Sequence, residues 1–169
     1  MLFCTGQFAF FFLLVFVLYW SMPWPKARVY LLLAASFLFY ASWSAKLALL
    51  IVVSTTVDFF LARGIEASPS PRRRKLLLTI NILGNLGLLC YFKYTNFFLE
   101  SLQQVLNAAG YGVAWTPLKI MLPVGISFYT FEAISYMVDV YRERVAAEKN
   151  LAHFQLFILF FPHLVAGPI

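Results

Sequence analysis

Four residues between positions 129 and 139 offer the clearest acid–base chemistry in this sequence: Tyr129, Glu132, Tyr136 and Asp139. Their spacing of i, i+3, i+7 and i+10 places them on one face of an α-helix. Two carboxylates and two phenols on one face can donate, accept and transfer protons. Because a carboxylate facing lipid is costly, this face must point into the protein or into a water-filled cavity. We therefore expect these residues to line a polar tunnel.

The two carboxylates of this face differ in their surroundings. Asp139 lies close in sequence to Arg142 and Arg144, so we expect an ion pair near the end of the helix. Glu132 has no cation nearby in the sequence. This difference favours Glu132 as the deeper group in the tunnel wall.

The histidines are His153 and His163. His153 belongs to the first turn of an expected helix, where a solvated or capping role is favoured. His163 follows Pro162 at an expected helix break, and broken helices at membrane depth line cavities, so we also place His163 in the tunnel wall. With no carboxylate or nucleophile close in sequence to orient it, His163 is a lesser candidate for catalysis. The sequence contains no metal-binding pattern, phosphate loop or serine elbow.

The composition defines the class of protein that must position these residues. Of 169 residues, 62% are hydrophobic and 12% are charged, whereas a soluble domain has about 45–50% and about 25%. A disordered chain is excluded by the same hydrophobicity. We predict an all-α, polytopic membrane protein with about six membrane helices of about 20 residues each. The two cysteines, Cys4 and Cys90, are expected to be buried free thiols.

The apolar runs give the expected membrane spans. We predict spans over 2–20, 29–43, 47–61 and 76–99, a fifth that begins at Pro123, and a sixth over 151–161. A tight connection at 44–46 would make the second and third spans antiparallel neighbours. Asn150 is the expected N-cap of the last span. Residues 101–119 are expected to form a connection at the outer surface.

Basic residues follow alternate spans and predict the orientation of the chain. They comprise Lys26, Arg28, Arg63, Arg72, Arg73, Arg74, Lys75, Arg142, Arg144 and Lys149. The positive-inside rule places these connections in the cytoplasm and the N-terminus outside. Asp58, near the cytoplasmic end of the third span, is expected to pair with Arg63.

Two long motifs resemble a known family. LPVGISFYTF at 122–131 with ISYMVDVYR at 134–142, and FFPHLVAGPI at 160–169, are similar to motifs of the membrane-bound O-acyltransferase (MBOAT) family; weaker similarity covers 38–41 and 91–98. The match is best to the alginate O-acetyltransferase branch and next best to the branch that exports D-alanyl groups to teichoic acid. The resemblance spans the whole chain but covers about the first third of a family member. The chain also stops within an apolar run, as expected of a truncated sequence.

The resemblance implies a ring of membrane helices around a tunnel, with residues 1–169 as the N-terminal part of a single transmembrane domain. It implies transfer of an acyl group, favoured as acetyl, across the membrane to hydroxyls of an extracytoplasmic polysaccharide. No cofactor is expected to remain bound; the donor would be acetyl-CoA or an acyl carrier protein on the cytoplasmic side. The family's catalytic histidine is expected beyond Ile169, so this part alone should be inactive.

The resemblance also implies the bilayer and extracytoplasmic polysaccharide-modifying proteins as partners, no nucleic acid, and a multi-pass location in the bacterial plasma membrane. Its motifs leave the acceptor open between alginate, cellulose, another exopolysaccharide and teichoic acid. A membrane transporter or channel module, with the 129–139 face as its inner surface, and a non-catalytic helical scaffold remain alternative functions.

Overall fold

A computed structural model describes residues 6–112, 114, 116, 118, 120, 123 and 125–166, and within them the secondary structure is entirely α-helical. This confirms the predicted all-α class. The helices are α1 (Gly6–Ser21), α2 (Pro25–Ala67), α3 (Pro71–Ala108), α4 (Ile126–Tyr141), α5 (Leu151–Leu159) and α6 (Phe161–Ala166). By length and composition, α2 and α3 can each cross a membrane.

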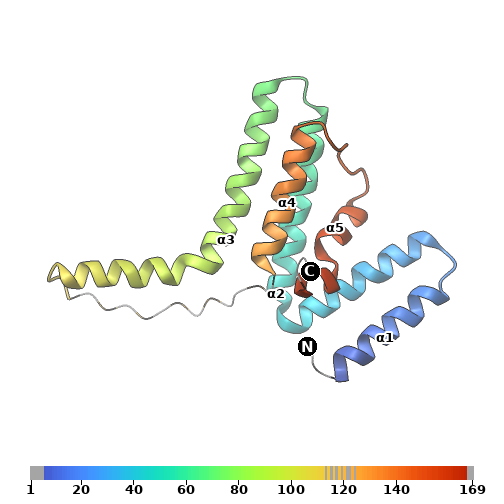
Figure 1. Ribbon diagram of the computed structural model, residues 1–169, viewed down its shortest axis with the longest axis horizontal. Helices are drawn as coiled ribbons and strands as arrows, with labels where there is room; N and C mark the ends of the chain where they lie inside the picture. The colour runs from blue at the N-terminus through green and yellow to red at the C-terminus, as the bar shows by residue number, and fades with distance from the viewer. Residues whose placement is uncertain are drawn as a thin grey trace.

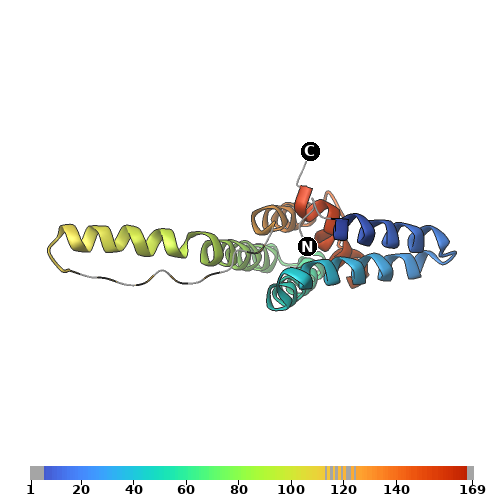
Figure 2. The same ribbon diagram turned by 90° about the horizontal axis from the view of Figure 1, so that it is seen from below.

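The first helix lies beside the first half of α2 (Figures 1 and 2). The chain leaves α1 at Ser21, and α2 begins with Pro25, a residue well suited to a first helical turn. Arg28 closes the turn, because its Nε donates a hydrogen bond to the Met22 carbonyl at 2.8 Å. These two helices therefore form a hairpin that extends away from the remaining bundle (Figure 1).

The predicted second and third spans form one bent helix, α2, and the prediction that they are antiparallel neighbours is wrong. Ser44 alone within α2 has an extended backbone (φ −160°, ψ 116°), and its Oγ accepts a hydrogen bond from the Leu47 amide at 3.4 Å. Serine thereby caps the second half of the helix. The two halves meet at an angle at this residue (Figure 1). A single extended residue redirects the helix but does not reverse it.

The third helix is longer than the sequence predicted. It begins at Pro71, after the short connection at Ser68–Ser70, bends partway along its length and continues to Ala108 (Figure 1). The expected connection over 101–119 is therefore helical in its first part. Cys90 is a free thiol as expected, but it is exposed on α3 rather than buried. Cys4 lies outside the described residues.

Helix α4 begins three residues after the predicted start at Pro123, whereas α5 begins at Leu151 as predicted and ends at Leu159, before the predicted end at Phe161. Pro123 precedes α4, and Gly125 precedes its first residue with a left-handed backbone, φ 73°. Asn150 is the N-cap of α5, as predicted, and its Oδ1 accepts a hydrogen bond from the Ala152 amide at 2.9 Å. The helix break falls at Phe160, before Pro162 rather than at it. Proline fits the first turn of α6, because its missing N–H has no partner there.

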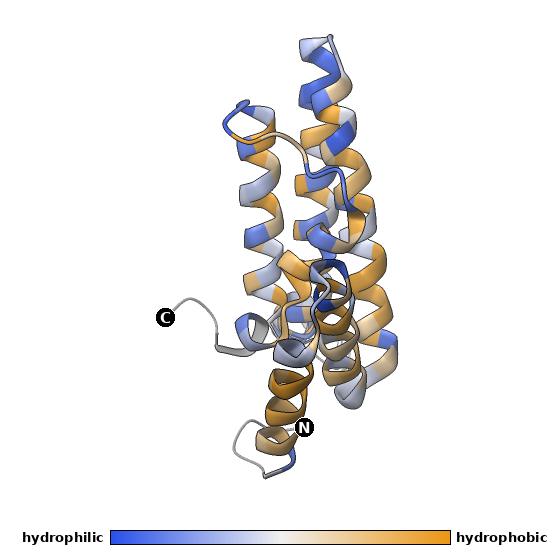
Figure 3. Ribbon diagram, turned by 90° about the vertical axis from the view of Figure 1, so that its right-hand side faces the viewer, coloured by the Kyte–Doolittle hydropathy of each residue, from blue (hydrophilic) through white to orange (hydrophobic). Residues whose placement is uncertain are grey.

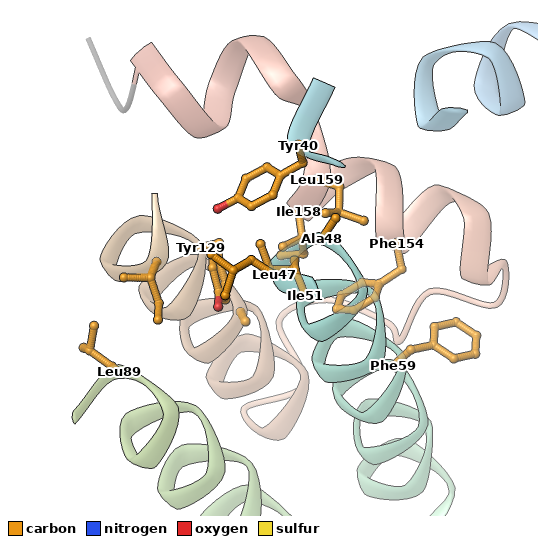
Figure 4. Close-up of a cluster of buried hydrophobic side chains, with 12 residues drawn as sticks. Tyr40, Leu47, Ala48, Ile51, Phe59, Leu89, Tyr129, Phe154, Ile158 and Leu159 are labelled. Atoms are coloured by element: carbon orange, nitrogen blue, oxygen red, sulfur yellow. The ribbon is translucent and has the colours of Figure 1, made fainter. Parts of the chain in front are cut away.

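The central core joins α2, α4 and α5. Ile51 of α2, Tyr129 of α4 and Ile158 of α5 are each at most 1% exposed and lie in one cluster (Figure 4). A second, aromatic cluster holds Phe161 of α6 against Phe39 of α2, with ring centroids 5.6 Å apart. Burial of these large side chains fixes α4 and α5 against the second half of α2, and α6 against its first half.

A buried polar cluster joins α2 to α3 and corrects the expected pairing of Asp58. Oδ1 of Asp58 accepts hydrogen bonds from Nδ2 of Asn81 and from Nδ2 of Asn85, the latter at 2.9 Å. Arg63 instead lies over the Phe59 ring, with its guanidinium carbon 5.7 Å from the ring centroid. Asn81 and Asn85 are one turn apart on α3 and both face Asp58 of α2, so three polar groups lie in one helix interface, where each needs a partner.

Hydrophilic residues gather at one end of the bundle, where α2 leads into α3 and α4 leads toward α5 (Figure 3). Arg74 joins these two connections: it pairs with Glu143, donates to the Tyr141 carbonyl at 2.7 Å and lies over the Tyr141 ring. Lys26 and Arg28 stand apart from this end, at the tip of the α1–α2 hairpin (Figure 1).

Candidate functional site

A cavity of about 700 Å³ lies between α4 and α5, and we call it the α4–α5 cavity. Its size falls within the range of small-molecule sites in proteins, about 300–1,000 Å³. Aromatic rings form much of its wall, and the polar groups come chiefly from one side of α4. Its titratable lining residues are Glu132, Tyr136, Asp139, Glu148 and His153.

Glu132 is a largely enclosed carboxylate in the wall of this cavity. Its side chain is 11% exposed, and its Oε1 lies 3.6 Å from Nδ1 of His163. Its Oε2 is buried and has no hydrogen-bond partner among the described residues. The fold therefore supplies the imidazole partner that the local sequence around Glu132 lacks, and it leaves one carboxylate oxygen available for a further donor.

His163 is held between Glu132 and an aromatic ring. The His163 and Phe128 rings meet edge to face, with centroids 4.6 Å apart, and the His163 side chain is 38% exposed. No carboxylate lies close to this histidine in the sequence, but the packing of α4 and α6 brings Glu132 beside it from 31 positions away. A carboxylate next to one ring nitrogen can set the orientation and tautomer of an imidazole.

His163 faces a second cavity, of about 620 Å³, which we call the α5–α6 cavity. His153 and Phe157 line both cavities. Glu132 thus belongs to one cavity and His163 to the other, and their contact lies at the boundary between the two. His153, which is exposed near the beginning of α5, is shared by both.

Tyr136 and Asp139 hold the loop that closes the α4–α5 cavity. The Tyr136 hydroxyl accepts a hydrogen bond from the Glu148 amide at 2.8 Å, and its ring packs against Phe154 at 5.0 Å. Asp139 pairs with Arg144 at 3.6 Å, and its carbonyl accepts from the Arg144 amide at 2.9 Å. The predicted ion pair of Asp139 is confirmed, with Arg144 as the partner.

Tyr129 lies apart from the other residues of the predicted face. Its side chain is 1% exposed and packs into the central core near Tyr40 and Leu47 (Figure 4). Its hydroxyl is buried without a hydrogen-bond partner among the described residues. The ring turns toward α2, whereas Glu132, Tyr136 and Asp139 turn toward α5.

The described residues contain no group of three or more His, Cys, Asp and Glu side chains that could hold a metal ion. What the site can do is move or hold a proton: the Glu132–His163 pair offers an acid and a base in contact, beside cavities large enough for an organic group. An acyl transfer to a hydroxyl needs such a base to take the hydroxyl proton.

Curated proteins similar to the chain share one kind of activity in their names. The chain is 39% identical over 170 residues to the probable alginate O-acetylase AlgI of Pseudomonas aeruginosa and 38% identical over 175 residues to that of Azotobacter vinelandii, and each match covers the whole chain. It is 33% identical over 162 residues to the peptidoglycan O-acetyltransferase of Helicobacter pylori, across 82% of the chain. The chain belongs to the MBOAT family.

This MBOAT chain spans about a third of the length of the curated relatives it matches: 32%, 34% and 30% of the three proteins named above. No family model matches the chain, and no solved structure matches it. The resemblance seen in the sequence motifs is confirmed, and an MBOAT protein is a membrane protein, as the composition predicted.

Reasoning from the sequence alone did not predict two contacts of this MBOAT chain. Glu132 directly follows the quoted motif at 122–131, and His163 lies within the quoted motif at 160–169, so the shared resemblance of these motifs to one family was the available signal that the two regions meet. The Asp58 cluster had a weaker signal: Asn81 and Asn85 are one helical turn apart, so they share a face of α3 that can meet a single acceptor.

Proposed function

We propose that this chain is part of a membrane-bound O-acetyltransferase that transfers an acetyl group to hydroxyls of an extracytoplasmic polysaccharide such as alginate. The observation that carries the proposal is the match of the whole chain to probable alginate O-acetylases at up to 39% identity. The Helicobacter pylori relative is also named as an O-acetyltransferase, and its name gives peptidoglycan as the acceptor. Acetyl is therefore favoured over D-alanyl as the transferred group.

The proposal gives the protein a cytoplasmic thioester donor, acetyl-CoA or an acyl carrier protein, and extracytoplasmic partner proteins that present the polysaccharide. It places the protein in the bacterial plasma membrane as a multi-pass protein with its N-terminus outside. We further propose that residues 1–169 form the first part of a single transmembrane domain. The catalytic histidine would then belong to the part of the protein that follows.

Within this proposal, the α4–α5 cavity forms part of the path of the acetyl group; Glu132 lines this cavity, and His163 lines the adjoining α5–α6 cavity. Support comes from the size of the cavity, from its largely aromatic lining and from the enclosed Glu132–His163 contact. Glu132 acts as a positioning residue, because its carboxylate holds the His163 imidazole at the boundary between the two cavities. Tyr136 and Asp139 act by holding the loop over the path.

The experiment is complementation in a bacterium whose own alginate O-acetylase gene has been deleted. The full-length protein that contains residues 1–169 is expressed there, and the acetyl ester content of the exported alginate is measured by proton NMR, with the protein level checked by immunoblot. We expect the esters to return. Release of D-alanine from teichoic acid, with no acetyl ester on any polysaccharide, would move the protein to the other branch; solute flux in liposomes without ester formation would favour a transporter.

The role of Glu132 is tested in the same assay. Glu132→Leu removes the contact with His163, and we expect acetyl transfer to fall by roughly tenfold or more, on the order of the smaller general acid–base effects. Glu132→Gln keeps the shape and one hydrogen-bonding oxygen, and it should retain more activity than Glu132→Leu. Glu143→Gln is the matched control, because Glu143 lines neither cavity and its side chain, which pairs with Arg74, is 73% exposed. Equal activities of Glu132→Leu and Glu143→Gln would exclude this role for Glu132.

A further inference from the structure

A third cavity, of about 300 Å³, runs along α1 on the side that faces the α5–α6 junction, and we call it the α1 groove. Phe12, Phe16, Tyr19 and Trp20 of α1 line it, together with Leu32 of α2 and Pro162. The side chains of Phe12, Phe16 and Trp20 are 45%, 52% and 63% exposed. From Phe12 to Trp20 the helix rises by about 12 Å, so the groove is long as well as apolar.

The guanidinium group of Arg28 lies at one end of the α1 groove. The guanidinium carbon of Arg28 lies 5.1 Å from the centroid of the Tyr19 ring and 6.0 Å from that of Trp20. Its Nε is occupied by the Met22 carbonyl, but its two terminal amino groups have no carboxylate partner among the described residues. Arg28 therefore retains a charged, planar donor pair of the kind that binds phosphate.

The charged side chains of the segment that carries α1 and the first half of α2 are all basic. Residues 1–57 contain Lys26, Arg28 and Lys46 but no aspartate or glutamate. An anionic headgroup would meet attractive charge here, whereas the ammonium group of a zwitterionic headgroup would find no acid in this part of the sequence. A charge at one end and an apolar trough along the rest match a molecule with a phosphate head and a hydrocarbon chain.

We propose that Arg28 and the α1 groove form a binding site for an anionic phospholipid. The terminal amino groups of Arg28 bind the lipid phosphate, and one acyl chain lies along the groove from Trp20 toward Phe12. Tyr19 and Trp20 lie beside Arg28, and aromatic residues of this kind favour the boundary between lipid headgroups and hydrocarbon. This inference goes beyond acetyl transfer and does not depend on it, so the lipid site can be tested in a catalytically inactive protein.

The test uses the full chain in nanodiscs of phosphatidylcholine that contain a small fraction of brominated lipid, because bromine quenches tryptophan fluorescence on contact. The signal of Trp20 is obtained as the difference between the wild type and Trp20→Phe. We expect brominated phosphatidylglycerol to quench this signal with roughly fivefold higher affinity than brominated phosphatidylcholine, the effect of one cation near an anionic lipid. Arg28→Gln should bring the two lipids to equal affinity.

Two further variants separate the site from general effects of charge or folding. Arg63→Gln is the matched control: Arg63 also lies over an aromatic ring of α2, at 5.7 Å, but far from the groove in sequence, and its removal should leave the preference unchanged. Arg28→Lys keeps the charge and should keep most of the preference. Gel filtration and circular dichroism establish that each variant is folded.

Three outcomes would overturn the proposal. Equal quenching of the wild type by both lipids would mean that the groove contacts bulk bilayer and selects no headgroup. Quenching by neither lipid would mean that other protein, such as a second copy, covers the groove. Loss of the preference in Arg63→Gln, or its persistence in folded Arg28→Gln, would show that Arg28 is not the headgroup site.

Discussion

Replacing Asp58 with alanine should destabilise the protein by an amount that the hydrogen bonds around it define. Asn81 and Asn85 are 1% and 4% exposed, and both donate to Oδ1 of Asp58. Alanine would leave the Asn81 amide as a buried donor without its acceptor, at a cost of about 1–3 kcal/mol. Asn85 also donates to the Asn81 carbonyl at 3.2 Å, so it would lose only one net hydrogen bond, worth about 0.5–1.5 kcal/mol.

The sum predicts that the free energy of unfolding of Asp58→Ala falls by about 1.5–4.5 kcal/mol. The free energy of unfolding of the full chain is measured in bicelles by steric trapping, which reports reversible unfolding. Asp139→Ala is the control, because it breaks the exposed pair with Arg144, where a loss of at most about 1 kcal/mol is expected. A second variant tests the mechanism: with leucine at 58, 81 and 85, no buried donor remains, and most of the stability should return.

Two results would refute this reasoning. The first is a free energy of unfolding of Asp58→Ala within about 0.5 kcal/mol of the wild-type value. That result would mean that the polar groups also find partners in the unfolded chain within the membrane, so the hydrogen bonds add little net stability. The second is a triple leucine variant less stable than Asp58→Ala, which would show that packing at this interface, rather than hydrogen bonding, determines the loss.

Three other substitutions have defined expectations. Arg74→Ala removes the pairing with Glu143 and the bond to the Tyr141 carbonyl, so unfolding in bicelles should become easier by about 1–3 kcal/mol; a loss no larger than that of Glu143→Gln would contradict this. Gly125→Ala places a Cβ on a residue with φ 73°, so the free energy of unfolding should fall by about 1–2 kcal/mol; an unchanged free energy of unfolding would show that the backbone adapts. Phe161→Ala empties a site that is 1% exposed, with an expected loss of about 3–5 kcal/mol and faster hydrogen exchange in α6; unaltered exchange would mean that other contacts hold α6.

Much of the fold was predictable because apolar runs report directly on membrane helices. The all-α class, the N-cap at Asn150 and the pairing of Asp139 with an arginine all rest on neighbours within a few residues in sequence. The bend at Ser44 was not predictable as a bend, because Ser-Ala-Lys suits both a turn between two helices and a cap within one. Only the packing of both halves of α2 against other elements decides between them.

The site was predictable in its residue types but not in its contacts. Helical periodicity placed Glu132, Tyr136 and Asp139 on one face, and they line one cavity. Periodicity could not separate Tyr129 from them, because the choice between core and cavity depends on where α2 and α5 pack around α4. The contact of Glu132 with His163 spans 31 positions and a helix break, so it depends on the tertiary fold.

The polar cluster between α2 and α3 has a consequence for how the chain enters the membrane during synthesis. Asp58 lies 23 and 27 positions before its two asparagine partners, and the connection between the helices is short. All three residues are therefore present once translation reaches Asn85, before any residue of α4 exists. The two helices can insert together as a hairpin with the carboxylate already paired, which avoids its exposure to hydrocarbon. Arg74 and Glu143 are 69 positions apart, so that contact completes a later stage of assembly.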